Sequence, residues 1–134
     1  MGFLNDHSER IYAALRIMSG LLFLQHGLQK IFGLFGGSQE GTPGFIVYGA
    51  GGIELVCGVL LAIGLFAAPA AFLASGTMAA AYFMGHLART GEFFPILNGG
   101  ELAILYCFTF LLIAAKGSGI WSVDAARAGG AGAS

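Results

Sequence analysis

The stretch Leu24-Gln25-His26-Gly27-Leu28-Gln29-Lys30-Ile31-Phe32-Gly33 closes an apolar run that begins at Ile11. The run is long enough to form a membrane-spanning helix. Four polar side chains therefore lie where the helix reaches its far surface, and two of them, His26 and Lys30, are ionisable. Ionisable groups at that depth are costly, so they indicate a partner or a function. The rest of the chain has to supply the residues that meet them.

The composition is that of an integral membrane protein. Of the 134 residues, 57% are hydrophobic and 10% are charged, and the mean hydropathy is +0.81. A soluble domain carries roughly 25% charged residues. The 23 glycines agree, because small residues let membrane helices pack closely. We expect one all-α domain over residues 1–134, surrounded by membrane lipid. A net charge of −1 offers no basic surface and argues against a nucleic-acid partner.

Turn-rich sequence divides the chain into four apolar segments, each predicted to span the membrane. The first is too long for a cleavable signal peptide and lacks an A-x-A-like end, so we expect it to be retained. Ala68-Pro69 is expected to break the second span from the third, with Pro69 at the start of the third, and Asn98 is expected to cap the fourth. The prediction is an antiparallel four-helix bundle in the membrane. Its spans are about 11–32, 45–67, 70–87 and 100–115.

Four spans place both termini on one side of the membrane. Four cations lie on that side and two on the other: Arg10, Arg16, Lys116 and Arg127 against Lys30 and Arg89. The positive-inside rule therefore predicts that both termini are cytoplasmic. Residues 120–134 would form a cytoplasmic tail with a mobile end. Arg16 lies inside the first span and is expected to snorkel back to the near surface.

Most ionisable groups at membrane depth collect at the outer ends of the predicted spans. They are His26 and Lys30 in the first span, Glu54 in the second, His86 and Arg89 in the third, and Glu101 in the fourth. His26 and Lys30 are four residues apart and share a helix face, with Gln29 at its edge. We expect these faces to converge on a pocket in the outer leaflet, because ligand sites of helix bundles lie between facing helices.

This cluster has three interpretations. In the first it is structural: Glu54 pairs with Lys30, and Glu101 with His86 or Arg89, which holds the helices in register. In the second it binds a quinone or a similar small redox ligand, because imidazoles and carboxylates can bond carbonyl oxygens and carry protons. The candidates are His26, Glu54 and His86 for proton handling, and Gln29, Lys30, Glu54, Arg89 and Glu101 for ligand binding. In the third, two imidazoles and two carboxylates bind a metal; since they come from four helices without a Glu-x-x-His pair, we predict none.

The chain shows no motif for a tightly bound redox group. Cys57 and Cys107 lie in apolar runs without a C-x-x-C, so we expect two small buried core side chains. The alternative is a dithiol in contact with the pocket. No haem, iron–sulfur or dinucleotide motif is present, so a bound quinone or a partner would have to supply the redox group.

Several of these motifs resemble the DoxX family of small bacterial membrane proteins. The first helix is similar in Arg16, Gly20, Phe23, His26-Gly27, Lys30 and Phe32-Gly33, and the second in Gly51-Gly52-Ile53-Glu54, Gly58, Leu61 and Gly64. The fourth helix and tail are similar in Asn98-Gly99-Gly100-Glu101-Leu102 and Gly117-Ser118-Gly119-Ile120-Trp121-Ser122-Val123-Asp124. The resemblance covers about residues 10–125.

The resemblance implies a multi-pass protein of the bacterial inner membrane with a quinone-linked role. The family includes a subunit associated with a terminal quinol oxidase and thiosulfate:quinone oxidoreductases, and other members are linked to oxidative-stress complexes. On this basis we expect a membrane subunit that passes electrons from a small donor, such as a sulfur compound, to a quinone. The positions carried over from the family are His26, Lys30, Glu54, His86 and Glu101. The alternative is a non-enzymatic scaffold that assembles with a periplasmic or membrane oxidoreductase or with further copies of itself.

Overall fold

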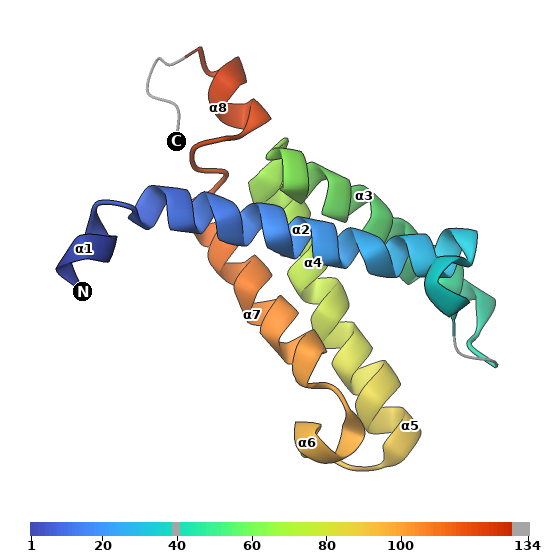
Figure 1. Cartoon of the computed structure of the whole chain (residues 1–134). Coiled ribbons are helices and arrows are strands. Elements are labelled where there is room, and N and C mark those ends of the chain that lie inside the picture. Colours follow the sequence, from blue (N-terminus) through green and yellow to red (C-terminus); the bar gives the residue numbers. More distant parts are fainter. Residues whose placement is uncertain (39–40, 130–134) are drawn as a thin grey trace.

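The computed structural model describes residues 1–38 and 41–129, and over these ranges it contains helices and loops without a strand (Figure 1). The predicted all-α class is therefore confirmed. The long helices are α2 (Ser8–Phe32), α3 (Gly51–Ile63), α4 (Ala67–Ala80) and α7 (Glu101–Lys116). A π-helical segment, η2 (Ile46–Ala50), precedes α3, and a second, η3 (Ala81–Leu87), continues α4 into α5 (Ala88–Thr90). The short elements are α1 (Gly2–Asn5), η1 (Leu34–Gly36), α6 (Pro95–Asn98) and α8 (Val123–Arg127). The predicted mobile end of the tail, residues 130–134, lies outside the described residues.

Three helices are long and apolar enough to cross a membrane: Ser8–Phe32, Ile46–Ile63 and Ala67–Thr90. They coincide with the first three predicted spans. The fourth predicted span coincides with α7, whose 16 residues are fewer than the ~20 that a bilayer requires. A membrane crossing by α7, and with it the four-helix membrane bundle, stays a prediction.

The long helices form two antiparallel hairpins that cross each other. Figure 1 shows α2 beside α3, and α4 beside α7, with the second pair running steeply away from the first. The hairpins approach each other near the turn between α3 and α4. They diverge toward the loop that follows α2 and toward the α5–α6 loop, so a fork separates them at that end.

Glycines let α2 and α3 meet with their backbones in contact. A Cβ atom on Gly58 would lie 2.6 Å from the backbone nitrogen of Leu24, and one on Gly27 would lie 2.5 Å from that of Leu55. Gly20 is equally crowded, since its Cβ would lie 2.5 Å from the nitrogen of Ala62. This small-residue packing is typical of membrane helices. It fixes the register of α3 against α2 and brings the polar ends of the two helices together.

The two hairpins share an aromatic core. Phe23 of α2 is fully buried, and its ring centroid lies 4.8 Å from that of Phe110 and 5.5 Å from that of Tyr106, both in α7. Tyr106 and Phe110 are stacked on each other at 5.3 Å. Such ring pairs contribute roughly 0.5–1.5 kcal/mol each beyond their buried area. They hold the hairpins together at the base of the fork.

The predicted break at Ala68-Pro69 was wrong. Helix α3 ends at Gly64, which has φ 73°, and α4 already begins at Ala67. A Cβ atom on Gly64 would lie 2.3 Å from the Cβ atom of Ser122, so both the backbone angle and the close approach require glycine. Pro69 lies in the first turn of α4, at the start of the third span as predicted, where its missing N–H removes no helical hydrogen bond.

The expected snorkelling of Arg16 was also wrong. The residue is fully buried, and its guanidinium donates to four backbone carbonyls: Leu61 at 3.0 Å, Ile120 at 3.0 Å, Trp121 at 2.7 Å, and Ser118. Residues 117–124 fold back over α2 and supply three of these carbonyls. The cation is therefore satisfied inside the protein, by a segment about a hundred residues away along the chain.

The same returning segment caps α4. The carboxylate of Asp124 accepts hydrogen bonds from the backbone N–H groups of Phe66 at 2.9 Å and Ala67 at 3.2 Å, and from the hydroxyl of Ser118. Burial opposes the charge on Asp124, but these hydrogen bonds and the nearby Arg127 outweigh it, so the pKa of Asp124 lies below its ordinary value. Residues 117–124, Arg16 and the turn 64–67 together form what we term the C-terminal clasp.

Candidate functional site

A cavity of about 640 Å³ lies in the fork between the hairpins. One wall comes from α2, η2 and α3, and the other from α4, η3 and α7. Its polar and ionisable lining residues are His26, Gln29, Lys30, Ser38, Thr42, Glu54, Thr77, His86, Arg89 and Tyr106. The remaining walls are apolar or small, and they include Phe23, Ile53, Met78, Met84 and Leu102. A mostly apolar cavity of this size with a few polar groups is typical of small-molecule sites.

The centre of the α2–α3 wall is an ion pair. Lys30 Nζ lies 2.8 Å from Glu54 Oε2 and 3.0 Å from Oε1, and the Glu54 side chain is only 4% exposed. This confirms the predicted pairing of the two residues. Gly51 makes the approach possible, because a Cβ atom there would lie 2.8 Å from the Cβ atom of Lys30. A carboxylate this deeply buried requires a partner, and Lys30 supplies it.

His26 connects this wall to the other hairpin. Its half-buried imidazole meets the ring of Tyr106 edge-on, with the ring centroids 6.1 Å apart. Gln29, one turn further along α2, donates from Nε2 to the carbonyl of Phe35 at 3.2 Å. Gln29 thus ties the loop after α2 to the rim of the cavity, whereas His26 lies toward its base.

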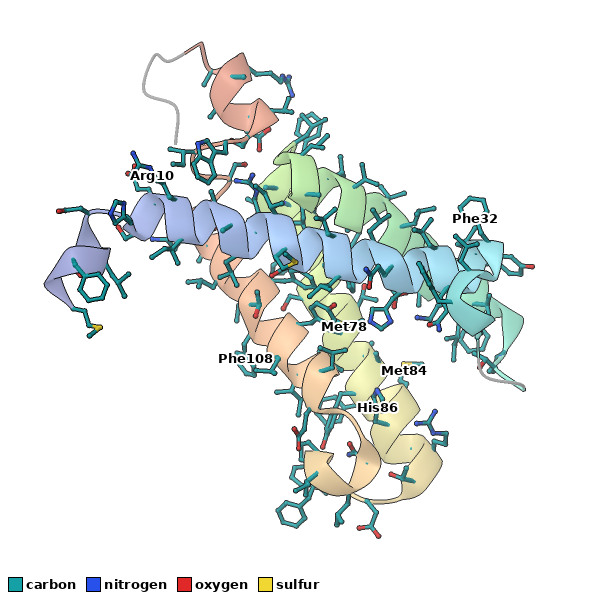
Figure 2. The ribbon with its side chains drawn as sticks, in the orientation of Figure 1. Arg10, Phe32, Met78, Met84, His86 and Phe108 are labelled. Carbon is teal, nitrogen blue, oxygen red and sulfur yellow. The ribbon has the colours of Figure 1, made fainter. Side chains whose placement is uncertain are left out.

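The opposite wall carries His86. Met78, Met84 and His86 follow one another along α4 and η3, away from α2 (Figure 2). Nδ1 of His86 lies 3.3 Å from the backbone carbonyl oxygen of Asn98. Both residues belong to the α4–α7 hairpin, so the ring is anchored to the loop that joins these two helices.

Asn98 organises that loop and was not among the predicted site residues. Its side chain is almost fully buried, and Nδ2 donates to the hydroxyl of Tyr82 at 3.2 Å and to the carbonyl of Glu92 at 2.9 Å. Its Oδ1 accepts from the N–H of Gly100 at 2.8 Å, and Tyr82 donates in turn to the carbonyl of Phe93. The N-cap of α7 is Gly100, so the predicted capping of this helix by Asn98 was wrong, although the Asn98 side chain accepts from the N–H of Gly100. No local pattern reveals the contacts with Tyr82 or Glu92.

Both π-helical segments border the cavity. Ile46 and Ala50 come from η2, and Ala81, Met84, Gly85 and His86 come from η3. The wider π-helical turn is rare and occurs frequently at functional sites. The sequence carries no signal for either segment.

The hydroxyl of Ser38 is a further polar group of the lining. Its Oγ atom is buried and has no hydrogen-bond partner within the described ranges.

The remaining candidates are less central. Arg89 lines the cavity from an exposed position, whereas Glu101 is exposed and does not contribute to the lining. The predicted approach of Glu101 to the other polar groups is therefore not found in the described part of the chain. Cys57 and Cys107 are free thiols outside the lining. Within residues 1–38 and 41–129, no group of three or more His, Cys, Asp or Glu side chains is placed to hold a metal ion.

Comparison with known proteins assigns the chain to a family. The family model described as DoxX matches residues 11–87, more than half of the chain. The chain belongs to the DoxX family. Over 130 residues it is 42% identical to an uncharacterized protein of Haemophilus influenzae, with 92% of this chain and 96% of the relative covered. Over 114 residues it is 31% identical to a Bacillus subtilis protein named "Putative oxidoreductase CatD", with 82% and 81% covered. No solved structure matches the chain.

The segment matched by the DoxX model supplies both walls of the cavity. It includes His26, Gln29, Lys30 and Glu54 on one wall and His86 on the other, whereas Arg89 lies beyond it. DoxX membership and the three long apolar helices together indicate a membrane protein. The cavity is therefore built largely from the part of the chain that defines the family.

Proposed function

We propose that this DoxX protein is a membrane subunit of a quinone-linked oxidoreductase and that its cavity binds a quinone or a similar small redox ligand. The observation that carries the proposal is the buried Lys30–Glu54 pair, placed with two imidazoles in a cavity whose other walls are apolar. A relative 31% identical to this chain bears the name of an oxidoreductase, which supports the same direction.

The lining suits a flat ring that carries oxygens at its edge. Phe23, Ile53 and Met78 offer apolar surface to the ring. The Lys30 ammonium has three N–H donors, so it can bond a ligand oxygen while it remains paired with Glu54. The buried hydroxyl of Ser38 is a further group that a ligand could satisfy. Quinones combine these two properties, an apolar ring and oxygens that accept hydrogen bonds.

The charged side chains fit the chemistry of quinone reduction. Conversion of a quinone to a quinol takes up two electrons and two protons. Lys30 and Arg89 would stabilise negative charge on the reduced oxygens, and His26, Glu54 and His86 would exchange protons with them. We propose a small sulfur compound such as thiosulfate as the donor: two thiosulfates release two electrons as a sulfur–sulfur bond joins them. An oxidoreductase partner in the membrane or periplasm would be an alternative source of the electrons.

We further propose that the protein lies in the bacterial inner membrane with both termini in the cytoplasm and α7 as a fourth crossing. The cavity then opens in the outer half of the bilayer. Reporter fusions test this topology. A fluorescent protein fused at the C-terminus should fluoresce and a C-terminal alkaline phosphatase should be inactive, whereas phosphatase inserted at Gly91 should be active. The opposite pattern would overturn the orientation.

Binding to purified protein in lipid nanodiscs tests the proposed function. A short-chain benzoquinone should raise the melting temperature of the wild-type protein. The double variant Lys30→Gln/Glu54→Gln removes both charges without leaving one unpaired, and it should weaken binding at least about tenfold, the equivalent of 1.4 kcal/mol. Glu92→Gln neutralises an exposed carboxylate outside the lining and serves as the matched control. Absence of binding, or equal binding by the double variant, would instead favour the scaffold role.

A further inference from the structure

We propose that the cavity distinguishes the two redox states of its ligand and binds the quinol in preference to the quinone, because His86 presents a hydrogen-bond acceptor to it. This inference rests on the proposed function, and it specifies which redox form of the ligand the cavity binds more tightly. It follows from the tautomer of His86, from the loop that fixes this tautomer, and from the different chemistry of the opposite wall.

The contact between His86 and Asn98 determines which ring nitrogen carries the proton. A backbone carbonyl oxygen can only accept, so in the 3.3 Å contact Nδ1 of His86 is the donor. In the neutral imidazole the other nitrogen, Nε2, then has a free lone pair and acts as an acceptor. Since His86 lines the cavity and no hydrogen bond of Nε2 occurs among the described contacts, this acceptor is available to a ligand.

Asn98 keeps the carbonyl in place. Its side chain is 3% exposed, and it bonds Tyr82, Glu92 and Gly100 at once. These three contacts come from η3, from the loop after α5 and from the start of α7. The Asn98 carbonyl cannot turn away from His86 without disturbing them. Asn98 is therefore a positioning residue that acts through His86.

The opposite wall offers a donor. The Lys30 ammonium can only donate hydrogen bonds, and two of its three N–H groups are directed at the Glu54 oxygens. An oxygen of either redox state can accept a hydrogen bond from Lys30, so the ammonium does not tell them apart, and both Glu54 oxygens already accept from it. At His86 the states differ, because a quinol hydroxyl can donate to Nε2 whereas a quinone oxygen has no hydrogen to donate. One hydrogen bond of roughly 0.5–1.5 kcal/mol corresponds to a preference of up to about tenfold.

The test measures the affinities of a benzoquinone with one isoprenoid unit and of its quinol, under argon and at mildly alkaline pH, for protein in nanodiscs. We expect the wild-type protein to bind the quinol several-fold to about tenfold more tightly. His86→Leu should reduce this preference by weakening the binding of the quinol more than that of the quinone. Asn98→Asp keeps the acceptor for Gly100 but loses both donated bonds, and it should reduce the preference. Gly76→Ala, at an exposed site with open space around it, should leave both affinities unchanged.

The outcomes separate this inference from the proposed function. Binding of neither form by the wild-type protein would overturn both. Equal binding of the two forms, or a His86→Leu variant that weakens both equally, would overturn the inference and leave the proposed function standing. A cooperative thermal unfolding transition shows that each variant is folded. If His86→Leu does not fold, the ratio of quinol to quinone affinity in the wild-type protein and its change in Asn98→Asp still test the inference.

Discussion

Lys30 and Glu54 form a buried ion pair, with Nζ 2.8 Å from Oε2 and 3.0 Å from Oε1, at the end of α2 where the hairpins diverge. The glycine contacts between α2 and α3 set the register that brings the two side chains together. The pair therefore links the packing of the first hairpin to the chemistry of the cavity. Its energetics can be measured independently of any ligand.

Loss of one member of this pair should be far more costly than loss of both. Lys30→Met leaves the Glu54 carboxylate buried and unpaired, and breaking such a pair costs roughly 3–5 kcal/mol. The double variant Lys30→Met/Glu54→Gln should recover most of that loss. Reversible unfolding in mixed micelles of the wild type, Lys30→Met, Glu54→Gln and the double variant gives the coupling energy as a double-mutant cycle. Strictly additive effects would show that the pair contributes nothing.

Gly58 should tolerate no side chain, whereas Gly76 should. Gly58→Ala places a Cβ atom 2.6 Å from the backbone of α2, so the helices must separate, and overpacking of this kind costs roughly 1–3 kcal/mol. Gly76→Ala adds the same methyl group in open space on α4 and should be neutral or stabilise the helix by up to about 1 kcal/mol. Melting temperatures in detergent compare the two. Equal effects would contradict the close α2–α3 contact.

Arg16 should not be replaceable by lysine. The four carbonyls around it are spread over a planar fork of N–H groups, and an ammonium cannot reach them all. At roughly 1.5–3 kcal/mol for each hydrogen bond to a charged group, Arg16→Lys should cost about 2–5 kcal/mol. Limited proteolysis should then cut residues 117–128 sooner. Arg10→Lys, at an exposed position on the same helix, is the control and should behave as wild type.

The contribution of Asp124 should depend on pH. Its pKa in the folded protein lies below the ordinary value of 3.8, so the folded state favours the carboxylate. The stabilisation is therefore fully present above the unfolded pKa and is lost as pH falls through the lower folded pKa. The difference in unfolding free energy between wild type and Asp124→Asn should stay constant at neutral pH and shrink in acid below about pH 4. A difference that grows on acidification would refute this account of the clasp.

Local sequence patterns predict the helices and part of the site. The long apolar runs predict the three membrane-length helices, and the depth of Lys30 and Glu54 predicts their pairing, because each is costly alone. The burial of Arg16 cannot be predicted from local sequence, because three of its carbonyl partners lie about a hundred residues further along the chain. Glu101 is exposed and does not line the cavity, because a shared depth does not fix which way a helix face points. The Asn98 network is not predictable from local patterns, because its members come from η3, from the loop after α5 and from the start of α7.

The C-terminal clasp also has a consequence for the order in which the molecule is made. The N–H groups of Phe66 and Ala67 are capped by a carboxylate 58 and 57 residues further along the chain. At about 5–20 residues per second, a ribosome needs roughly 3–12 s to cover that distance. During this interval α2 and α3 can pack against each other through their glycines. The N-terminus of α4 has no cap from Asp124 yet, and Arg16 lacks three of the four backbone carbonyls that accept its hydrogen bonds. The Asp124 cap can therefore form only after both hairpins have been synthesised, and a nascent chain interrupted before Asp124 would hold both hairpins without this cap.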